Sequence, residues 1–435
     1  MTARIEASGG QPQLKRTLGL WQVTLSGVGI VIGAGIYVLI GSAAEEAGNA
    51  LWLAFVIAAV MSALTGLSYA ELASMFPAAS AEYEFARQAF NEFVAFITGW
   101  AMVLANVIAA AAVSIGFGHY LAHFVDVDVR VSSACLLAVL TLVSISGIER
   151  SVWLTVLLAL VEISGLVLVI VAGAPHVGEQ DLLAGGSVTS VLGASALVFF
   201  AFIGFDEVVT LSEETQNPSR TIPRALLLAL GISTLLYVLV GISAVSVLGG
   251  DGLAASAQPL TQVMEHNWGA SAGDIVAVIA LASTTNTSLL VMIAGSRVIY
   301  GMAQRGALPR VFATVNQRAR TPHLAAVGVL VLALPFVAPG EIDFAASLTD
   351  LTIYAVFILV NLAVIILRRR RPDLPRSFRA PGRIGNLPLT PVLGLVTVVG
   401  LALFLDWQTW LFGSLCLLPG VILWYALSKQ RSAVP

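Results

Sequence analysis

Charged residues are scarce in this chain of 435 residues. Asp, Glu, Lys and Arg make up 11% of it, whereas about 25% is usual in soluble globular domains. Hydrophobic residues make up 58%, and the mean hydropathy is +0.91. So little charge cannot cover a water-exposed surface, which excludes soluble globular, disordered and fibrous proteins. The formal net charge of −3 also leaves no basic surface for a nucleic acid.

Cysteine is nearly absent, and so are the motifs of several functional classes. Cys135 and Cys416 both fall in apolar runs, so we interpret them as small buried side chains rather than a disulfide or a metal pair. The sequence contains no GxxxxGK[ST] loop, so we expect no ATP site. It shows neither a cluster of metal ligands nor a paired nucleophile and base. We therefore expect no enzyme, no cofactor and no metal centre.

Long hydrophobic runs are what the chain has instead. A bilayer core about 30 Å thick requires roughly 20 apolar residues in a helix. The runs are continuous and lack the alternation of a membrane barrel, so strands are not expected. We predict an all-α integral membrane protein with twelve transmembrane helices, at residues 17–42, 51–73, 93–122, 132–147, 153–173, 190–212, 224–248, 273–303, 323–338, 345–367, 388–405 and 410–427. Residues 74–92 are expected to hold an amphipathic helix at the bilayer surface.

The basic residues indicate the orientation, because Lys and Arg accumulate in cytoplasmic loops. If the N-terminus is cytoplasmic, the inward segments hold 21 of the 22 basic residues, and Arg130 is the exception. We therefore expect both termini to be cytoplasmic, in a plasma membrane. The predicted organisation is a cytoplasmic tail at 1–16, helices 1–5 at 17–173, helices 6–10 at 190–367, a basic cytoplasmic linker at 368–387, helices 11–12 at 388–427 and a cytoplasmic tail at 428–435.

Two of the predicted helices contain features that weaken a helix. The first contains Gly27, Gly29, Gly33 and Gly35, and each Gly costs roughly 1 kcal/mol relative to Ala. Close helix packing is one explanation, and a break at 32–35 is the other. The sixth has Gly204 at mid-span, followed by Asp206 and Glu207. Breaks in helices 1 and 6 would imply two inverted five-helix repeats, as in a class of transporters whose substrates bind at the unwound segments.

The free ends of broken helices have opposite preferences for charge. Unpaired N–H groups at Gly33, Ala34 and Gly35 would attract a carboxylate. Unpaired carbonyl groups at Ile32 and at 200–203 would suit an ammonium group. A site with both ends fits an α-amino acid.

Five blocks of sequence, in order, resemble the amino acid–polyamine–organocation superfamily, and most of all its cationic amino acid transporter branch. They are "GVGIVIGAGIYVLIG", "LSYAELASMFPAASAEYEFARQAF", "FFAFIGFDEVVTLSEETQNPSRTIPRAL", "GSRVIYGMAQRGALPRVF" and "RRRRPDLPRSFRAP". The resemblance implies a substrate carboxylate on the amides of Gly33, Ala34 and Gly35. It implies the substrate amino group on the carbonyls of Ile32, Phe200, Ala201 and Ile203, with Phe200 and Phe202 as candidate gates. Asp206 matches an acidic position of the family, whereas Glu207 is less usual there.

Glu162 lies in the middle of the fifth helix, roughly 15 Å from either interface. Many members of the family carry a lysine there, which takes the place of a sodium ion. A protonated Glu162 could donate a hydrogen bond to the carbonyl of Gly29 or Ile32. Alternatively, a sodium ion could lie between those carbonyls, the Glu162 carboxylate and helix 8. Thr285 and Asn286 on helix 8 match the positions that face the contact between helices 1 and 8 in the family. A third interpretation is an ordinary buried hydrogen bond without a role in coupling.

Other polar residues have structural and functional interpretations. Asn106 and Tyr354 could bond to neighbouring helices or border the pocket, Tyr354 as a gate. Glu71 is interpreted as an interfacial or salt-bridged acid. Glu213, Glu214, Arg220 and Arg224 could cap and bridge a cytoplasmic loop or form an inner gate.

Taken together, these features predict a secondary amino acid transporter that works by alternating access, with proton symport as the first mechanism. An amino acid or polyamine exchanger and a non-transporting amino acid sensor are the alternatives.

Overall fold

A computed structural model describes residues 18–76, 81–146, 152–211, 215–316, 321–385 and 387–432. The chain in these ranges is almost entirely helical. The α-helices are α1 (Leu20–Ile32), α2 (Gly35–Ala47), α3 (Leu51–Met75), α4 (Ala81–Ala89), α5 (Glu92–Leu121), α6 (Val129–Ser146), α7 (Val152–Gly173), α8 (Val188–Val198), α9 (Glu207–Thr210), α10 (Pro218–Ala254), α11 (Pro259–Trp268), α12 (Ala270–Gln304), α13 (His323–Val337), α14 (Ile342–Arg370), α15 (Leu389–Ala402) and α16 (Trp407–Ser432). The 3₁₀-helices are η1 (Gly48–Ala50), η2 (Ala174–His176), η3 (Phe199–Phe202) and η5 (Arg310–Ala313), and the strands are β1 (Arg383–Ile384) and β2 (Leu387–Pro388).

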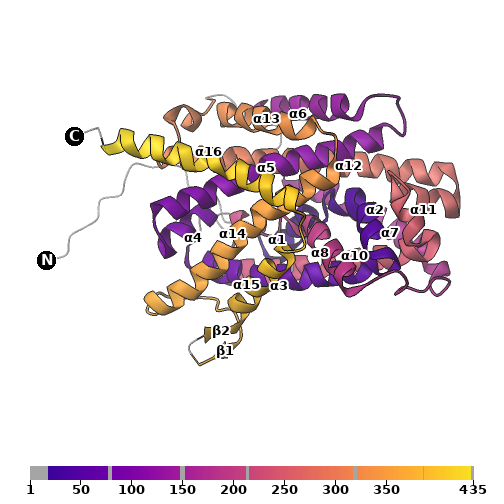
Figure 1. The fold of residues 1–435 in the computed structure, drawn as a ribbon, viewed down its shortest axis with the longest axis horizontal. Helices are drawn as coiled ribbons and strands as arrows, with labels where there is room; N and C mark the ends of the chain where they lie inside the picture. The colour runs from indigo at the N-terminus through magenta and orange to yellow at the C-terminus, as the bar shows by residue number, and fades with distance from the viewer. Residues whose placement is uncertain are drawn as a thin grey trace.

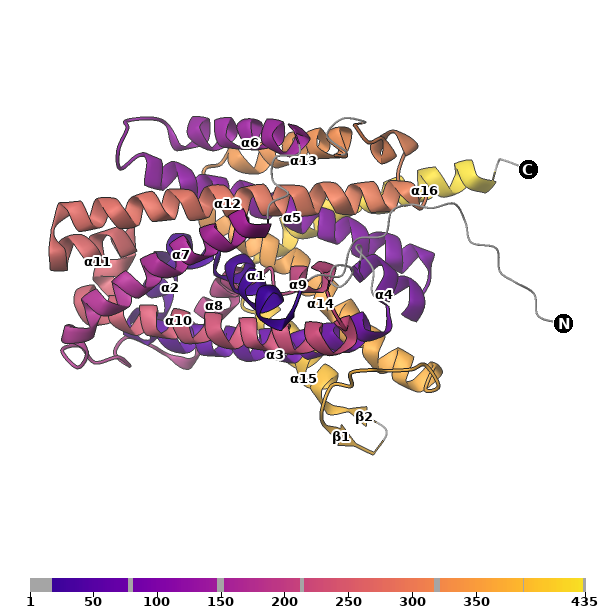
Figure 2. The ribbon, with the colours of Figure 1, turned by 180° about the vertical axis from the view of Figure 1, so that it is seen from behind.

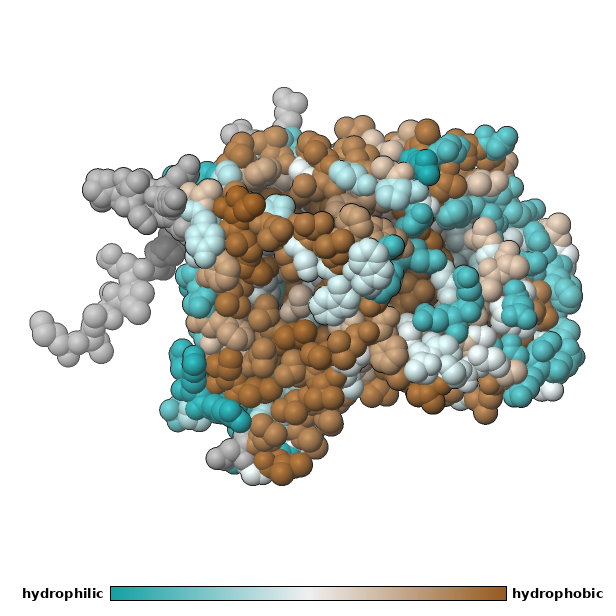
Figure 3. All heavy atoms as spheres, viewed as in Figure 1, coloured by the Kyte–Doolittle hydropathy of each residue, from teal (hydrophilic) through white to brown (hydrophobic). Residues whose placement is uncertain are grey.

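Most of these helices are suited to a bilayer. In the described ranges, nine helical stretches are long and apolar enough to cross a membrane, one of them the continuous run Gly35–Met75. Three shorter apolar helices accompany them: Leu20–Ile32, His323–Val337 and Leu389–Ala402. On the face drawn in Figure 3, hydrophobic residues dominate the middle, and hydrophilic residues gather towards the ends of the long axis. The chain is therefore a multi-pass membrane protein.

The interior is formed around the interrupted first helix. Figures 1 and 2 both place α1 at the centre of the molecule, with α6 and α13 side by side along one edge. The long helices α5, α10, α12 and α14 pack around this centre. Cys135 on α6 is exposed, which corrects the expectation of a buried side chain, because this peripheral helix turns one face outwards.

Several boundaries differ from those expected from hydropathy. The predicted helix 224–248 is longer, since α10 starts at Pro218, a residue favoured in the first turn of a helix. Helix α11 was not expected, because its polar residues interrupt the apolar pattern; Pro259 starts it, and Gly269 at φ +84° ends it. Helix α14 continues to Arg370, into the predicted linker. The antiparallel pair β1–β2 lies at the end of this linker and extends one residue beyond it, although no strands were expected.

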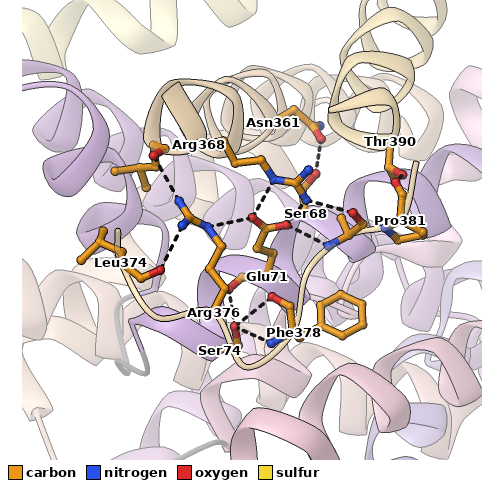
Figure 4. A network of polar contacts seen from close by, with 12 residues as sticks. Ser68, Glu71, Ser74, Asn361, Arg368, Leu374, Arg376, Phe378, Pro381 and Thr390 are labelled. Atoms are coloured by element: carbon orange, nitrogen blue, oxygen red, sulfur yellow. Dashed lines mark hydrogen bonds and ion pairs between the residues drawn. The ribbon is translucent and has the colours of Figure 1, made fainter. Parts of the chain in front are cut away.

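A buried ion-pair network attaches this linker to the C-terminal end of α3 (Figure 4). Glu71, which is 1% exposed, accepts hydrogen bonds from Arg368 Nε at 2.9 Å and from the Ala380 amide at 2.8 Å. Arg376 Nε lies 3.3 Å from the same carboxyl group. The interpretation of Glu71 as a salt-bridged acid is thus confirmed, and its charge is compensated by two buried arginines.

Candidate functional site

The first helix is interrupted where the sequence contains Gly-Ala-Gly. Helix α1 ends at Ile32, and α2 begins at Gly35. Between them, Gly33 has φ +29°, a backbone conformation that glycine adopts most readily. The amide of Ala34 leaves the helical ladder and donates to Thr287 Oγ1 on α12 at 3.0 Å. Thr287 was not among the predicted site residues, because the sequence analysis favoured Thr285 and Asn286 on the same helix.

The sixth predicted helix is interrupted in the same way. Helix α8 ends at Val198 and continues as the four-residue 3₁₀-helix η3. Gly204 then has φ +112°, and its amide donates to Asp206 Oδ1 at 3.1 Å. Helix α9 begins at Glu207, so the two acidic residues lie at the start of the second half-helix rather than within a continuous helix.

The two interruptions touch each other. A Cβ atom added at Gly35 would lie 2.4 Å from Ala201 Cα, so only glycine allows the backbones to approach this closely. A Cβ atom at Gly204 would lie 2.8 Å from Ile30 Cγ2 and 3.1 Å from the Ile30 carbonyl oxygen. The N-terminal end of α2 therefore lies against η3, and the turn at Gly204 lies against the end of α1.

Tyr237 on α10 connects both breaks through one hydroxyl group. Its Oη lies 2.7 Å from the Val31 oxygen, 2.9 Å from the Ile32 oxygen and 2.9 Å from the Ala201 oxygen. The side chain is fully buried, and its ring packs edge-on against Phe202 at 5.2 Å between centroids. Sequence reasoning missed Tyr237. The available signal was a tyrosine within an apolar helix, whose hydroxyl needs a hydrogen-bond partner when buried.

A small cavity lies between the breaks. Its volume is about 30 Å³, so the surrounding side chains close tightly around it. Of the described residues that line the cavity, Thr287 is the one with a polar side chain. The lining residues are Ile30, Val31, Gly33, Ala34, Gly35, Ala109, Val113, Phe200, Ala201, Ile203, Thr287 and Val291.

A larger cavity of about 240 Å³ lies further along α2 and α5. Ser42, His119 and Asp343 contribute polar side chains to its wall, and the Ser42 hydroxyl donates to the Asp343 carboxylate at 2.6 Å. Val38 on α2 and Gly116 on α5 also line this larger cavity, and the two helices are in tight contact there. A Cβ atom at Gly116 would lie 2.2 Å from Cγ1 of Val38.

Glu162 is 1% exposed and faces α12. Its Oε1 accepts a hydrogen bond from Asn286 Nδ2 at 3.1 Å, and its backbone carbonyl accepts one from the Tyr37 hydroxyl at 2.8 Å. Ser283 interacts with the same carboxyl group, although neither Ser283 Oγ nor Glu162 Oε2 makes a hydrogen bond of ordinary geometry. Thr285 donates its hydroxyl to Leu281 on its own helix at 2.7 Å.

The carbonyl groups expected near Glu162 are already engaged. The Gly29 oxygen accepts from the Gly33 amide at 3.4 Å, and the Ile32 oxygen accepts from Tyr237. A Cβ atom at Gly29 would lie 2.4 Å from Cβ of Ala159, so α1 and α7 are in close contact about one turn from Glu162.

The remaining predicted residues lie around this centre. Phe200 lines the cavity, whereas Phe202 packs against Tyr237. Asn106 donates to Met102 on its own helix at 2.9 Å rather than to a neighbouring one. The Tyr354 hydroxyl donates to the Ala196 oxygen at 3.0 Å. Two acids of the predicted inner gate, Glu213 and Glu214, lie outside the described residues.

Comparison with known proteins agrees with this geometry. The amino acid permease family matches residues 18–423. A branched-chain amino acid permease, BcaP of Bacillus subtilis, is 32% identical over 98% of this chain and 96% of its own length. A methylthioribose transporter of the same bacterium is 27% identical over the same shares of the two chains. Cationic amino acid transporter 2 of Arabidopsis thaliana, described as vacuolar, is 31% identical over 86% of this chain and 64% of its own. These relatives are named as transporters or permeases and not as enzymes. A family match over nearly the whole chain, around two apposed helix breaks, shows that the protein belongs to the amino acid permease family of the amino acid–polyamine–organocation superfamily.

Proposed function

We propose that this protein is a secondary transporter that takes up L-amino acids by alternating access around the two helix breaks. The observation that supports this most is their direct apposition, with the amide end of one half-helix and the carbonyl ends of others meeting at one cavity. In this proposal α1–α7 and α8–α14 are two inverted repeats, α15 and α16 are additions, and both termini lie in the cytoplasm beneath a plasma membrane. Unwound segments of this kind are where such transporters bind substrate.

The substrate would bind by exchanging partners with the protein's own hydroxyl groups. Its carboxylate would take the amides of Gly33, Ala34 and Gly35, at the positive end of α2. The Ala34 amide would leave Thr287 to do so. The ammonium group would take carbonyls at the negative ends, those of Ile32 and 200–203.

The lining of the cavity favours a neutral, apolar side chain on the substrate. Ala109, Val113 and Val291 supply apolar surface, and no charged residue is among those that line the cavity. Asp206 is held by the Gly204 amide instead of facing the cavity. The names of the relatives include branched-chain and cationic amino acids and methylthioribose, so a binding panel over the twenty amino acids is the direct test of this preference.

For coupling, the geometry around Glu162 supports a proton more than a sodium ion. Asn286 directs a donor group, Nδ2, at the carboxyl group. A sodium ion requires oxygen ligands, and it would have to share the Gly29 and Ile32 oxygens with the Gly33 amide and the Tyr237 hydroxyl.

The test is uptake by purified protein in proteoliposomes with an imposed pH gradient. We expect the wild type to accumulate a neutral amino acid above its outside concentration. Glu162→Gln should lose this accumulation while retaining exchange against internal substrate. Glu179→Gln, on an exposed loop, is the matched control and should behave as wild type.

Each alternative gives a different result in the same assay. Accumulation by Glu162→Gln with unchanged pH dependence contradicts proton coupling at this residue. Dependence on a sodium gradient would favour the sodium site. Transport that requires substrate on both sides indicates an exchanger, and binding without transport indicates a sensor.

A further inference from the structure

The basic linker at 368–387 lies between two helices of the membrane-spanning part. It contains seven arginines and one acid, Asp373. Helix α14, which is long and apolar enough to cross a bilayer, ends within the linker at Arg370, and the apolar helix α15 begins directly after it at Leu389. Both ends of the linker therefore lie at the same surface of the bilayer, in the layer of lipid headgroups.

Two of the seven arginines fold the linker onto the bundle (Figure 4). The side chains of Arg368 and Arg376 are only 7% and 6% exposed, and both lie against the Glu71 carboxyl group. Arg376 also donates to backbone carbonyl groups of the linker itself. At the other end, the Leu389 amide donates to the Gly382 oxygen at 3.1 Å. The linker thus follows a fixed path rather than hanging loose in solvent.

This path leaves a group of arginines on the outside of the linker. We call them the surface arginines: Arg369, Arg370, Arg371 and Arg379. All four are exposed, and none of them forms an ion pair with another described residue. In Figure 3, hydrophilic residues gather where Figure 1 shows the C-terminal end of α14. Their guanidinium groups are therefore available to an anion from outside the chain.

An exposed apolar side chain accompanies the surface arginines. Ile384 on β1 is 67% exposed, although isoleucine is among the residues most often buried. Figures 1 and 2 both show the β1–β2 hairpin projecting from the bundle next to α15. Arginine binds phosphate groups with two parallel hydrogen bonds, and isoleucine gains free energy by entering hydrocarbon. Basic residues beside exposed apolar ones are typical of segments that lie in a bilayer interface.

We propose that the surface arginines and Ile384 form a docking surface for anionic phospholipids. The headgroup phosphates bind the guanidinium groups, and Ile384 enters the outer part of the acyl chains. The anions that a bilayer presents at this depth are lipid phosphates, which is why a lipid fits better than a soluble partner. Since the same linker holds Arg368 of α14 on Glu71 of α3, a bound lipid also stabilises the contact between these two helices.

The test is a thermal-shift titration of the full-length protein in detergent, with phosphatidylglycerol as the anionic lipid and phosphatidylcholine as the neutral one. We expect phosphatidylglycerol to stabilise the wild type at lower concentrations, and the difference to shrink as salt is raised, because salt screens exposed charges. A variant with Arg369→Gln, Arg370→Gln and Arg371→Gln should need at least about tenfold more phosphatidylglycerol, since each arginine near an anionic surface contributes roughly a factor of five. Ile384→Ser should weaken the binding of both lipids at every salt concentration.

The matched control removes the same charge from three exposed arginines outside the linker. It combines Arg220→Gln, Arg224→Gln and Arg310→Gln, and it should bind phosphatidylglycerol as the wild type does. An equal loss in both triple variants overturns the proposal, and so does a wild type that does not distinguish the two lipids. Equal stabilisation by inorganic phosphate would also overturn it, because the surface would then serve a soluble anion.

The titration does not measure transport, so its outcome is separate from that of the proposed function. A protein that prefers phosphatidylglycerol in the expected way but does not move amino acids refutes the proposed function alone. A protein that accumulates amino acids without this lipid preference refutes the docking surface alone.

Discussion

Removing the Tyr237 hydroxyl should weaken the substrate-free protein and strengthen substrate binding. The hydroxyl has one hydrogen and faces three carbonyl oxygens, two of which are predicted ligands of the substrate ammonium group. Tyr237→Phe leaves these buried oxygens without a donor, which costs about 1–3 kcal/mol. Loss of the hydroxyl also removes a group that competes with the substrate ammonium for these oxygens. The substrate-bound protein should therefore lose less stability than the substrate-free protein.

The measurement is a thermal-shift assay with and without saturating substrate. We expect a lower melting temperature for Tyr237→Phe alone, and a larger rise on adding substrate than in the wild type. If about 1.4 kcal/mol of the loss is recovered on binding, affinity tightens about tenfold. Tyr120→Phe is the matched control, because Tyr120 is equally buried and its hydroxyl bonds a single oxygen, that of Tyr37, at 2.8 Å.

Two results would refute this reasoning. The first is a Tyr237→Phe variant that is no less stable than Tyr120→Phe. The second is a substrate-induced shift smaller than that of the wild type, because it would mean that the hydroxyl group assists the substrate instead of competing with it.

Three further predictions follow from the described contacts. Gly204→Ala should lower the melting temperature, since φ +112° and the contact with Ile30 strain any side chain by about 1–3 kcal/mol. Glu71→Gln should destabilise the protein by about 3–5 kcal/mol, measured as loss of folded yield and melting temperature, because it leaves the buried Arg368 without its counter-charge. Burial raises the pKa of Glu82 on α4 from 4.5 to about 8, so the stability that this group contributes is present below about pH 4.5 and is lost as pH rises towards about 8. Glu82→Gln should flatten that decline in a pH series of melting temperatures, and an unchanged slope would show that Glu82 does not cause it.

Much of the architecture could be predicted because it depends on local composition. Apolar runs indicated the membrane helices. A glycine cluster indicated the interruption near 33, and Gly204, followed by two acidic residues, indicated the one near 204. Helix α11 could not be predicted in this way, because its polar residues hide the apolar pattern and its ends depend on Pro259 and Gly269. Hydropathy alone does not register a helix that lacks a long apolar run.

The partners of the site were harder to predict, because they depend on how helices rotate against each other. Residues two apart on a helix point in nearly opposite directions, so the choice between Thr285 and Thr287 requires the helix orientation. Tyr237 bonds carbonyl groups 36 to 206 residues away in sequence, which no local pattern indicates.

The contact between Gly116 and Val38 has a practical consequence for capturing another shape of the molecule. Val38 and Gly116 both line the larger cavity, and their contact leaves no room for a methyl group at 116. Gly116→Ala would therefore push α2 and α5 apart beside that cavity. A change of a single carbon atom thus offers experimenters a handle for biasing the protein towards a form in which these two helices are separated.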